Sequence, residues 1–198
     1  MAPTVVTPET FWINPTPSVP NSPLPIIVYR RALLDDHSPD TILSTIEPNG
    51  WYKGGQWKTF KKAHFHANTH ECYGILRGSS VYMLGVGGAD LGDEGEPGEG
   101  KGTRFFAEAG DVFVLPAGIS HCSVESEGDY EYIGLYPGEK DHKGARFDLH
   151  WCKDTPEKTK ELAEKAGNVP IPECDPLYGP DGPLPRIWKE AMEIKSNH

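Results

Sequence analysis

The sequence predicts an all-β protein, a small antiparallel β-barrel body with an irregular arm at each end. Two observations lead to this fold class. From about residue 50 to 137 the chain is a series of short β-like segments separated by turn residues. The composition agrees, because 22 Gly and 19 Pro among 198 residues exceed average usage and indicate many turns. The length suits one domain with a sizeable core.

The arm at the amino-terminal end, residues 1–25, contains seven prolines and reads as an extended segment, either packed along the body or loose. The body is expected over residues 26–150. It begins with the apolar run "PIIVYRRAL" and continues through "SSVYMLGV" and "GDVFVLPAG". The acidic, glycine-rich residues 86–103 favour a solvated hairpin loop; an irregular calcium loop is the remote alternative.

The last strand of the body is "DYEYIGLYPG", in which alternation places Tyr130, Tyr132, Gly134 and Tyr136 on one face. Residues 151–198 are expected to hold one short helix and a turn-rich tail. In "DTPEKTKELAEKAGN", Thr155 can cap the helix, Pro156 suits its first turn and Gly167 can end it.

Charge and cysteine usage limit the classes of partner and compartment. The net charge of −10 disfavours nucleic acid and anionic membranes as partners. There is no apolar run of about 18 residues for a membrane span, and the first residues do not resemble a signal peptide. The four cysteines show no CxxC spacing and read as free thiols of a reducing compartment, so a cytoplasmic protein is expected.

The stretch "HFHANTHECYGILRG", residues 64–78, holds the first half of a candidate metal site. Side chains two apart on a strand share a face, so His64 and His66 project together. Glu71 lies an odd number of residues further on, and a turn in "ANTH" would return it to the same face. From Glu71 the inward alternation continues through Tyr73 and Ile75.

The stretch "GDVFVLPAGISHCSVE" supplies the second half, with His121 starting a return strand after the turn at Pro116 and Gly118. A lone His-x-His pair is more often structural than metal-binding; the second segment is what favours a metal site. Three imidazoles and one carboxylate suit one divalent transition metal ion: Mn, Fe, Ni, Co, Cu or Zn. In a six-coordinate ion they would leave two positions open, which favours catalysis over a structural role.

The two stretches resemble the paired motifs of the cupin superfamily. They read His64-x-His66-x₄-Glu71-x₆-Gly78 and Gly110-x₅-Pro116-x-Gly118-x₂-His121. The resemblance implies an RmlC-like jelly-roll barrel whose metal ligands are His64, His66, Glu71 and His121. Two positions depart from the motifs, Lys58 in place of a glycine and Glu125 in place of an asparagine. Further blocks, "NGW", "YPGEK" and "DPLYGPDGPL...W", resemble the YjlB-like cupin subgroup, which is largely uncharacterised.

Other residues near these motifs have competing interpretations. His70 could replace Glu71 as a ligand, but we expect it to face outward or to support a ligand, and we expect Cys72 and Cys122 to be buried, inert thiols. Glu71, Tyr73 and Glu125 are the candidate catalytic residues, Glu71 and Glu125 as possible bases, with core packing open for Tyr73 and solvent exposure open for Glu125. Tyr82, Arg77 and Ser123 are further candidates to line the pocket. The aromatic residues Trp51, Trp57 and Phe60 could cover the barrel mouth or pack in the core.

These features lead to three functional hypotheses. The first is a metal-dependent enzyme acting on a small organic molecule, most simply an oxidoreductase of the dioxygenase kind. The second keeps the metal but makes the reaction a redox-neutral lyase, isomerase or cyclase. The third is a non-enzymatic binding module. The resemblance to cupins also implies a homodimer, with the proline-rich arm as a contact element.

Overall fold

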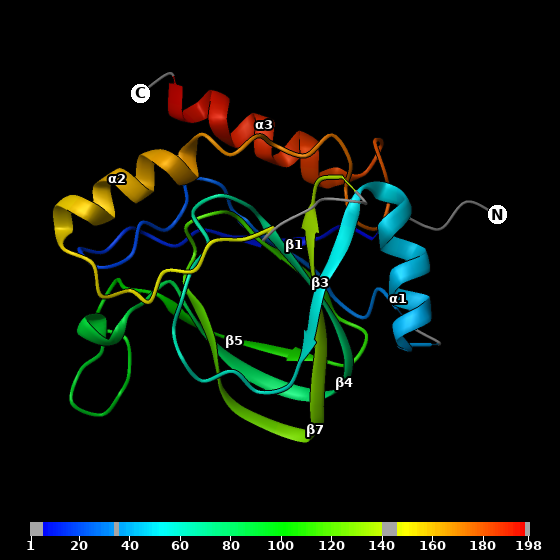
Figure 1. Ribbon diagram of the computed structural model, residues 1–198, viewed down its shortest axis with the longest axis horizontal. Helices are drawn as coiled ribbons and strands as arrows, with labels where there is room; N and C mark the ends of the chain where they lie inside the picture. The colour runs from blue at the N-terminus through cyan, green and yellow to red at the C-terminus, as the bar shows by residue number, and fades with distance from the viewer. Residues whose placement is uncertain (1–5, 34–35, 140–145, 197–198) are drawn as a thin grey trace.

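A computed structural model describes residues 6–33, 36–139 and 146–196, and its centre is a curled antiparallel sheet (Figure 1). The strand order is β1-β2-β6-β4-β7-β3, and β5 pairs with β4 outside this path. The strands are β1 (Glu9–Phe11), β2 (Ile26–Tyr29), β3 (Trp51–Trp57), β4 (Glu71–Leu84), β5 (Thr103–Glu108), β6 (Val112–Leu115) and β7 (His121–Pro137). The helices are α1 (Pro39–Ile46), α2 (Pro156–Gly167) and α3 (Pro183–Ser196), with short 3₁₀ turns η1 (Glu47–Asn49) and η2 (Gly88–Asp90).

Strands β4 and β7 are long enough to pass through both halves of the barrel. They pair from Cys72 opposite Leu135 to Leu84 opposite His121. β6 joins the first part of β4 and β5 joins the last part, so the sheet closes around a common interior. The bend lies at Gly78, whose φ of 67° is in the left-handed region and where a Cβ would lie 2.2 Å from the Glu127 carbonyl oxygen.

Alternation along these strands builds two apolar layers. Inward-facing residues such as Tyr73, Ile75, Tyr130 and Tyr132 fill the barrel. The opposite face of β2, β4, β6 and β7 is covered by α1 and α3, and Trp188 of α3 is fully buried there. Ile133 and Leu135 of β7 belong to this outer layer. The predicted two-faced pattern of residues 130–136 is therefore confirmed.

The helix content exceeds the sequence prediction of one C-terminal helix. α2 is confirmed, with Thr155 accepting a hydrogen bond from the Lys158 N–H and Pro156 in the first turn. α1 and α3 are additional. Both begin at a proline, Pro39 and Pro183, and α3 lies in the tail that had been expected to be turn-rich. Proline fits the first turn of a helix as well as it fits a turn, so composition did not separate the two.

Residues 6–25 of the proline-rich segment pack along the barrel rather than extending loosely from it. β1 pairs with β2, and Val19 and Asn21 are buried. The hydroxyls of Thr16 and Ser18 both donate to Asp90, a buried carboxylate in the otherwise mostly exposed acidic loop. Residues 1–5 lie outside the described part, and the three limits drawn from the sequence (1–25, 26–150, 151–198) remain predictions.

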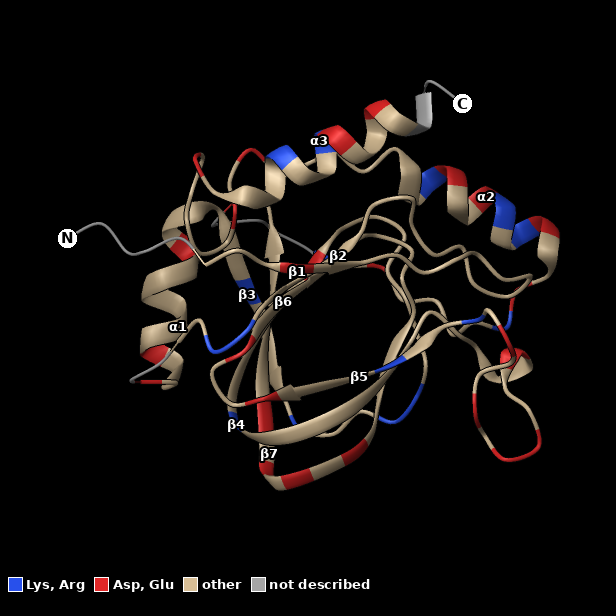
Figure 2. Ribbon diagram, turned by 180° about the vertical axis from the view of Figure 1, so that it is seen from behind, with Lys and Arg blue, Asp and Glu red and all other residues tan. Residues whose placement is uncertain are grey.

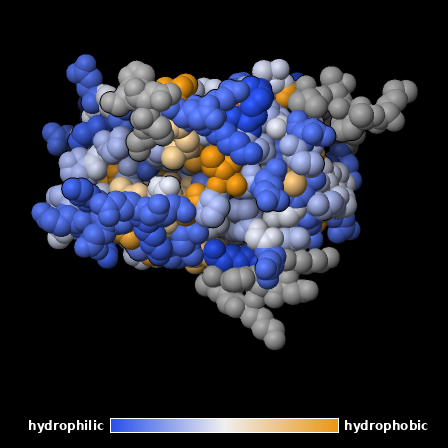
Figure 3. All heavy atoms as spheres, turned by 90° about the horizontal axis from the view of Figure 1, so that it is seen from above, coloured by the Kyte–Doolittle hydropathy of each residue, from blue (hydrophilic) through white to orange (hydrophobic). Residues whose placement is uncertain are grey.

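The face of the molecule drawn in Figure 3 is mainly polar, with apolar atoms reaching the surface near its middle. Acidic residues recur along β7 and in the loop of residues 86–103 (Figure 2). None of the helices in the described part of the chain has the length and apolar character needed to span a membrane.

Candidate metal centre

The two motif segments meet through their backbones. The His121 N–H donates to the His64 carbonyl at 2.8 Å, and the His64 N–H donates back at 3.3 Å. Two residues along, the Gly118 N–H donates to the His66 carbonyl at 2.8 Å. These bonds place the turn before β7 directly beside the segment before β4. The site predicted from two distant stretches of sequence is thus assembled by a short antiparallel pairing.

The three histidine rings converge on one point. The ring centroids of His64 and His121 lie 4.3 Å apart, and those of His64 and His66 lie 5.3 Å apart. One nitrogen of each of the three rings lies within 4.8 Å of the others, and all three residues are buried. Phe65, between the first two, points the other way into a separate apolar cluster. The shared face predicted for His64 and His66 is confirmed.

Each of these histidines uses Nδ1 to donate to a backbone carbonyl. His64 pairs with Lys62 at 2.9 Å, His66 with Asp148 at 2.5 Å and His121 with Ile119 at 3.1 Å. A carbonyl oxygen can only accept, so the proton of each neutral ring is on Nδ1. Nε2 then presents a lone pair toward the centre of the cluster. This is how a protein fixes the tautomer and orientation of imidazoles that bind a metal.

Glu71 faces the same point from the first residue of β4. Its Oε2 lies 3.2 Å from Nε2 of His66 and 3.2 Å from Nε2 of His121. The expected bend occurs at residues 67–68 and returns the carboxylate to the histidine face. Its other oxygen, Oε1, accepts a 2.5 Å hydrogen bond from the Tyr136 hydroxyl.

These atoms fit a metal ion. Oε2 of Glu71 and Nε2 of His121 are buried and have no hydrogen-bond partner among the described residues. A lone pair facing a carboxylate across 3.2 Å is unfavourable unless a proton or a cation lies between them. Two ligand atoms bound at about 2.1 Å to one ion lie about 3.0 Å apart at a right angle and about 3.4 Å apart at a tetrahedral angle. The two separations of 3.2 Å between Glu71 Oε2 and the histidine nitrogens lie within that range.

The pKa values of the cluster follow from burial and mutual charge. Burial and the neighbouring His121 lower the pKa of His64 to about 3, so its ring stays neutral. Burial acts to lower the pKa of His66 as well, but the Glu71 carboxylate outweighs it and the net shift is upward. Burial acts to raise the pKa of Glu71, yet His66 and His121 hold it well below its usual range. Glu71 is therefore an anion.

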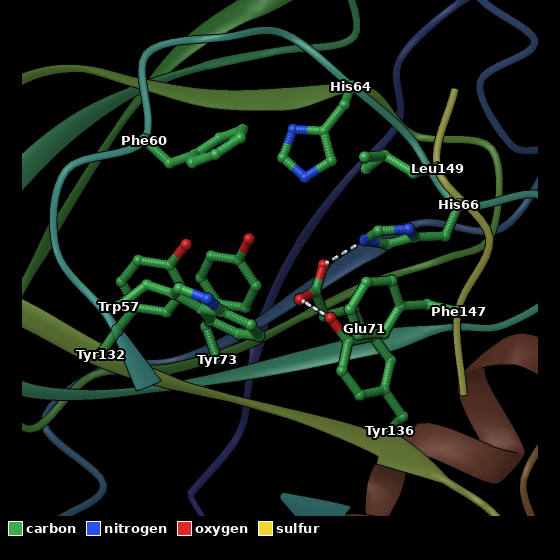
Figure 4. A pocket seen from close by; sticks show the side chains of 10 residues that line it. All are labelled: Trp57, Phe60, His64, His66, Glu71, Tyr73, Tyr132, Tyr136, Phe147 and Leu149. Carbon is green, nitrogen blue, oxygen red and sulfur yellow. Dashed lines mark hydrogen bonds and ion pairs between the residues drawn. The ribbon is translucent and has the colours of Figure 1, made fainter. Parts of the chain in front are cut away.

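His64, His66 and Glu71 form one end of a pocket of about 160 Å³ (Figure 4). Leu149 adds an apolar contact, and six aromatic rings complete the lining: Trp57, Phe60, Tyr73, Tyr132, Tyr136 and Phe147. Burial and the nearby Glu71 raise the pKa values of Tyr73 and Tyr136, so both hydroxyls remain protonated. Figure 4 shows the hydroxyls of Tyr73 and Tyr132 directed into the pocket below Phe60.

The position of Glu125 corrects the sequence prediction. Its side chain is 68% exposed on β7 and pairs with Arg104, so it lies outside the pocket and cannot be the second base. Tyr82 pairs with Ser123 while Val81 pairs with Glu125, which marks an irregularity of one residue in β7. A bulge of this kind reverses the alternation that had placed Glu125 on the same face as His121.

Of the other residues predicted near the site, some line the pocket and others do not. Tyr73 lines the pocket as expected, whereas Tyr82 and Ser123 are buried beside it and Arg77 is exposed and paired with Glu131. Trp57 and Phe60 line the pocket, and Trp51 packs in the core. Cys72 and Cys122 are buried in clusters outside the barrel interior, and burial raises both thiol pKa values.

His70 is a structural residue. Its Nδ1 accepts from the Ala117 N–H at 3.0 Å, and its Nε2 pairs with the Pro170 carbonyl at 3.1 Å. Both ring nitrogens are thus occupied, and the ring packs on Trp188 of α3.

Sequence reasoning missed Tyr132, Tyr136, Phe147 and Leu149 as lining residues. The first two share the inward face of residues 130–136; the last two carry no periodic signal.

The chain was compared with known proteins by sequence and by structure. The protein described as "Uncharacterized protein YjlB" of Bacillus subtilis is 30% identical over 181 residues, 91% of this chain and 96% of that protein. A scan against protein-family models found no match. Among solved structures, RmlC from Streptococcus suis matches with a TM-score of 0.34 and 12% identity over 68% of this chain and 72% of that one.

Oxalate decarboxylase from Bacillus subtilis matches with a TM-score of 0.31 and 18% identity over 64% of this chain, which spans 27% of that chain. At these scores neither solved structure bears on the reaction or substrate of this chain. The identity to YjlB extends over nearly the whole of both proteins, and the paired motifs meet in the barrel as described above. The chain belongs to the family of YjlB and is a cupin with a buried three-histidine cluster that could hold a metal ion.

Proposed function

We propose that the protein is a metal-dependent enzyme that acts on a small organic molecule, as an oxidoreductase of the dioxygenase type. The observation that carries the proposal is the buried three-histidine cluster beside a pocket, together with Oε2 of Glu71 and Nε2 of His121, which are buried without a hydrogen-bond partner among the described residues. A structural metal site has no need of an adjoining cavity, whereas a catalytic site keeps positions open toward one.

The ligands would be His64, His66, His121 and Glu71. When bound, a divalent transition metal ion would supply Lewis acidity and, if it is redox-active, a site for dioxygen. The chain contributes the orientation of each ligand, through the carbonyl bonds to Nδ1 and the Tyr136 bond to Glu71. The aromatic walls would keep water away from the reacting atoms, and the Tyr73 hydroxyl could donate a hydrogen bond to a bound oxygen atom.

Elemental analysis of protein purified without an affinity metal tests the ligand set. We expect close to one transition metal ion per chain in the wild type, and loss of that metal in His66→Ala and His121→Ala. His70→Asn is the matched control, because that ring faces away from the cluster and should leave the metal content unchanged. Wild-type protein that neither contains nor takes up a transition metal would end the proposal.

A redox-neutral lyase, isomerase or cyclase is the second candidate. The observation that favours it is the pair of protonated hydroxyls, Tyr73 and Tyr132, directed into the pocket beside an anionic carboxylate. Such a pair of donor and acceptor groups can move a proton without any change in oxidation state. Oxygen distinguishes the two candidates: turnover that is undiminished under strict anaerobiosis excludes dioxygenation. Small-molecule binding without any turnover would instead indicate the third hypothesis, a non-enzymatic binding module. We also propose that the protein forms a homodimer.

A further inference from the structure

The walls of the pocket define the kind of molecule it can hold. Apart from the predicted metal ligands, the lining consists of six aromatic residues and Leu149. The lining contains no Lys or Arg among the residues that the structure describes. Lys62, on the segment before His64, is held over the ring of Trp151, and neither residue lines the pocket. The only formal charge in the described lining is therefore the Glu71 carboxylate.

The charge balance limits the substrate further. Neutral histidines, one carboxylate and a divalent ion leave one net positive charge. A ligand whose metal-binding group carries a single negative charge neutralises it. A second carboxylate on the same molecule would lie among aromatic rings without a counter-ion, which is strongly unfavourable. Dicarboxylates and phosphorylated compounds are thus disfavoured.

The size and shape of the pocket favour a single ring. A cavity of about 150 Å³ lined by apolar side chains holds one benzene molecule, and this pocket measures about 160 Å³. Tyr73 stacks on Tyr132 with ring centroids 4.4 Å apart, and Tyr136 stacks on Phe147 at 4.7 Å. These two pairs present ring faces and edges from different sides of the pocket (Figure 4). Aromatic pairs attract one another beyond the area they bury.

We propose that the substrate is a small molecule built on one aromatic ring, which binds the metal through a singly charged oxygen chelate and carries no further anionic group. This inference rests on the proposed metal-dependent function and narrows it to a substrate class. Six rings around the cavity recognise the ring of the substrate, and the lack of a cation in the described lining rejects a second anion. Leu149 is 41% exposed and lines the pocket. An arginine at this position would supply the counter-ion that a second anionic group needs.

Three hydroxamates that share one metal-binding group but differ in the rest of the molecule test the proposal. Protein loaded with Zn²⁺, its metal content verified first, is titrated by calorimetry with benzohydroxamate, acetohydroxamate and succinic monohydroxamate. The second ligand carries a methyl group and the third a carboxylate tail. We expect benzohydroxamate to bind at least about tenfold more tightly than acetohydroxamate, and the carboxylate-tailed ligand to bind weakest.

Two arginine variants provide the matched control. Leu149→Arg should strengthen binding of the carboxylate-tailed ligand about tenfold more than it changes binding of acetohydroxamate, because only the former carries a second anion. Trp12→Arg makes the same change in net charge at a residue that is 60% exposed and outside the pocket, and should alter none of the three affinities. If the wild type binds the carboxylate-tailed ligand as tightly as benzohydroxamate, the substrate class is wrong while the metal site stands. If the wild type takes up no Zn²⁺ or other transition metal, the proposed function fails and this inference with it.

Discussion

Tyr136 donates a 2.5 Å hydrogen bond to Oε1 of Glu71, and this bond leaves Oε2 of the same carboxylate facing His66 and His121. The two residues come from neighbouring strands, β7 and β4. Because one oxygen is occupied by the hydroxyl, Glu71 can offer the histidine cluster a single, oriented ligand atom. Tyr136 is thus a positioning residue for the candidate metal centre.

Tyr136→Phe is expected to lower metal affinity by about 10-fold or more, since the loss of a hydrogen bond to a ligand commonly weakens binding by about 10- to 100-fold. Competition with a chromophoric chelator measures this affinity. Tyr130→Phe is the control: it also removes a buried hydroxyl from β7, but that hydroxyl contacts Tyr82 rather than Glu71. Equal losses in the two variants would contradict the positioning role.

Gly134→Ala is expected to damage the pocket without unfolding the barrel. A Cβ at this position would lie 2.6 Å from the Trp57 ring and 3.0 Å from Oε1 of Glu71, so the ring or the carboxylate must move. We predict weaker metal binding and a cost of about 1–3 kcal/mol in the free energy of unfolding. Gly167→Ala, with nothing within 4 Å of the added Cβ at the end of α2, should be close to neutral. Unchanged metal binding in Gly134→Ala would be the contrary result.

His70 makes the stability of the metal-free protein depend on pH. Burial lowers its pKa from 6.5 to about 4, so the unfolded state binds the proton more readily than the folded state. Stability from the neutral ring is fully present above pH 6.5 and is lost as the pH falls toward 4, a change of about 3 kcal/mol. Urea unfolding at a series of pH values should show this loss in the wild type. Between pH 6.5 and 4, the free energy of unfolding should fall by about 3 kcal/mol less in His70→Gln than in the wild type. If the free energies of the two proteins change in parallel with pH, His70 is not the cause of the loss.

Asp175 is expected to be essential for the attachment of α3. It is fully buried, accepts from the Tyr29 hydroxyl, and also accepts from the backbone N–H groups of Leu177, Tyr178 and Leu184. Asp175→Ala leaves these donors buried without an acceptor and should cost about 3 kcal/mol or more. Thermal unfolding compared with the exposed substitution Asp181→Ala gives the measurement. A melting temperature equal to that of Asp181→Ala would refute the assignment.

Local sequence determined the features that depend on alternation and on turn chemistry. The shared face of His64 and His66, the return of Glu71 after residues 67–68, and the outward burial of Cys72 all follow from side chains alternating along extended backbone. The helix from Pro156 to Gly167 follows from its cap and its proline. Alternation also fixed the inward face that carries Tyr132 and Tyr136, although their place in the pocket went unrecognised.

Tertiary structure decided the features that depend on which segments meet. Glu125 faces solvent because β7 is irregular opposite Val81 and Tyr82, and only the pairing with β4 reveals that irregularity. Phe147 and Leu149 line the pocket because residues 146–150 pass over it, held where Asp148 accepts from His66 and where the backbones of His150 and Phe65 pair. α1 and α3 form against the outer face of the sheet, where Ile42 and Trp188 are buried, and at α3 this burial outweighs the turn-rich character of the tail. Sequence therefore supplied the candidate ligands, and packing between distant segments supplied the walls of the pocket beside them, because alternation acts within a strand while a cavity is enclosed between strands.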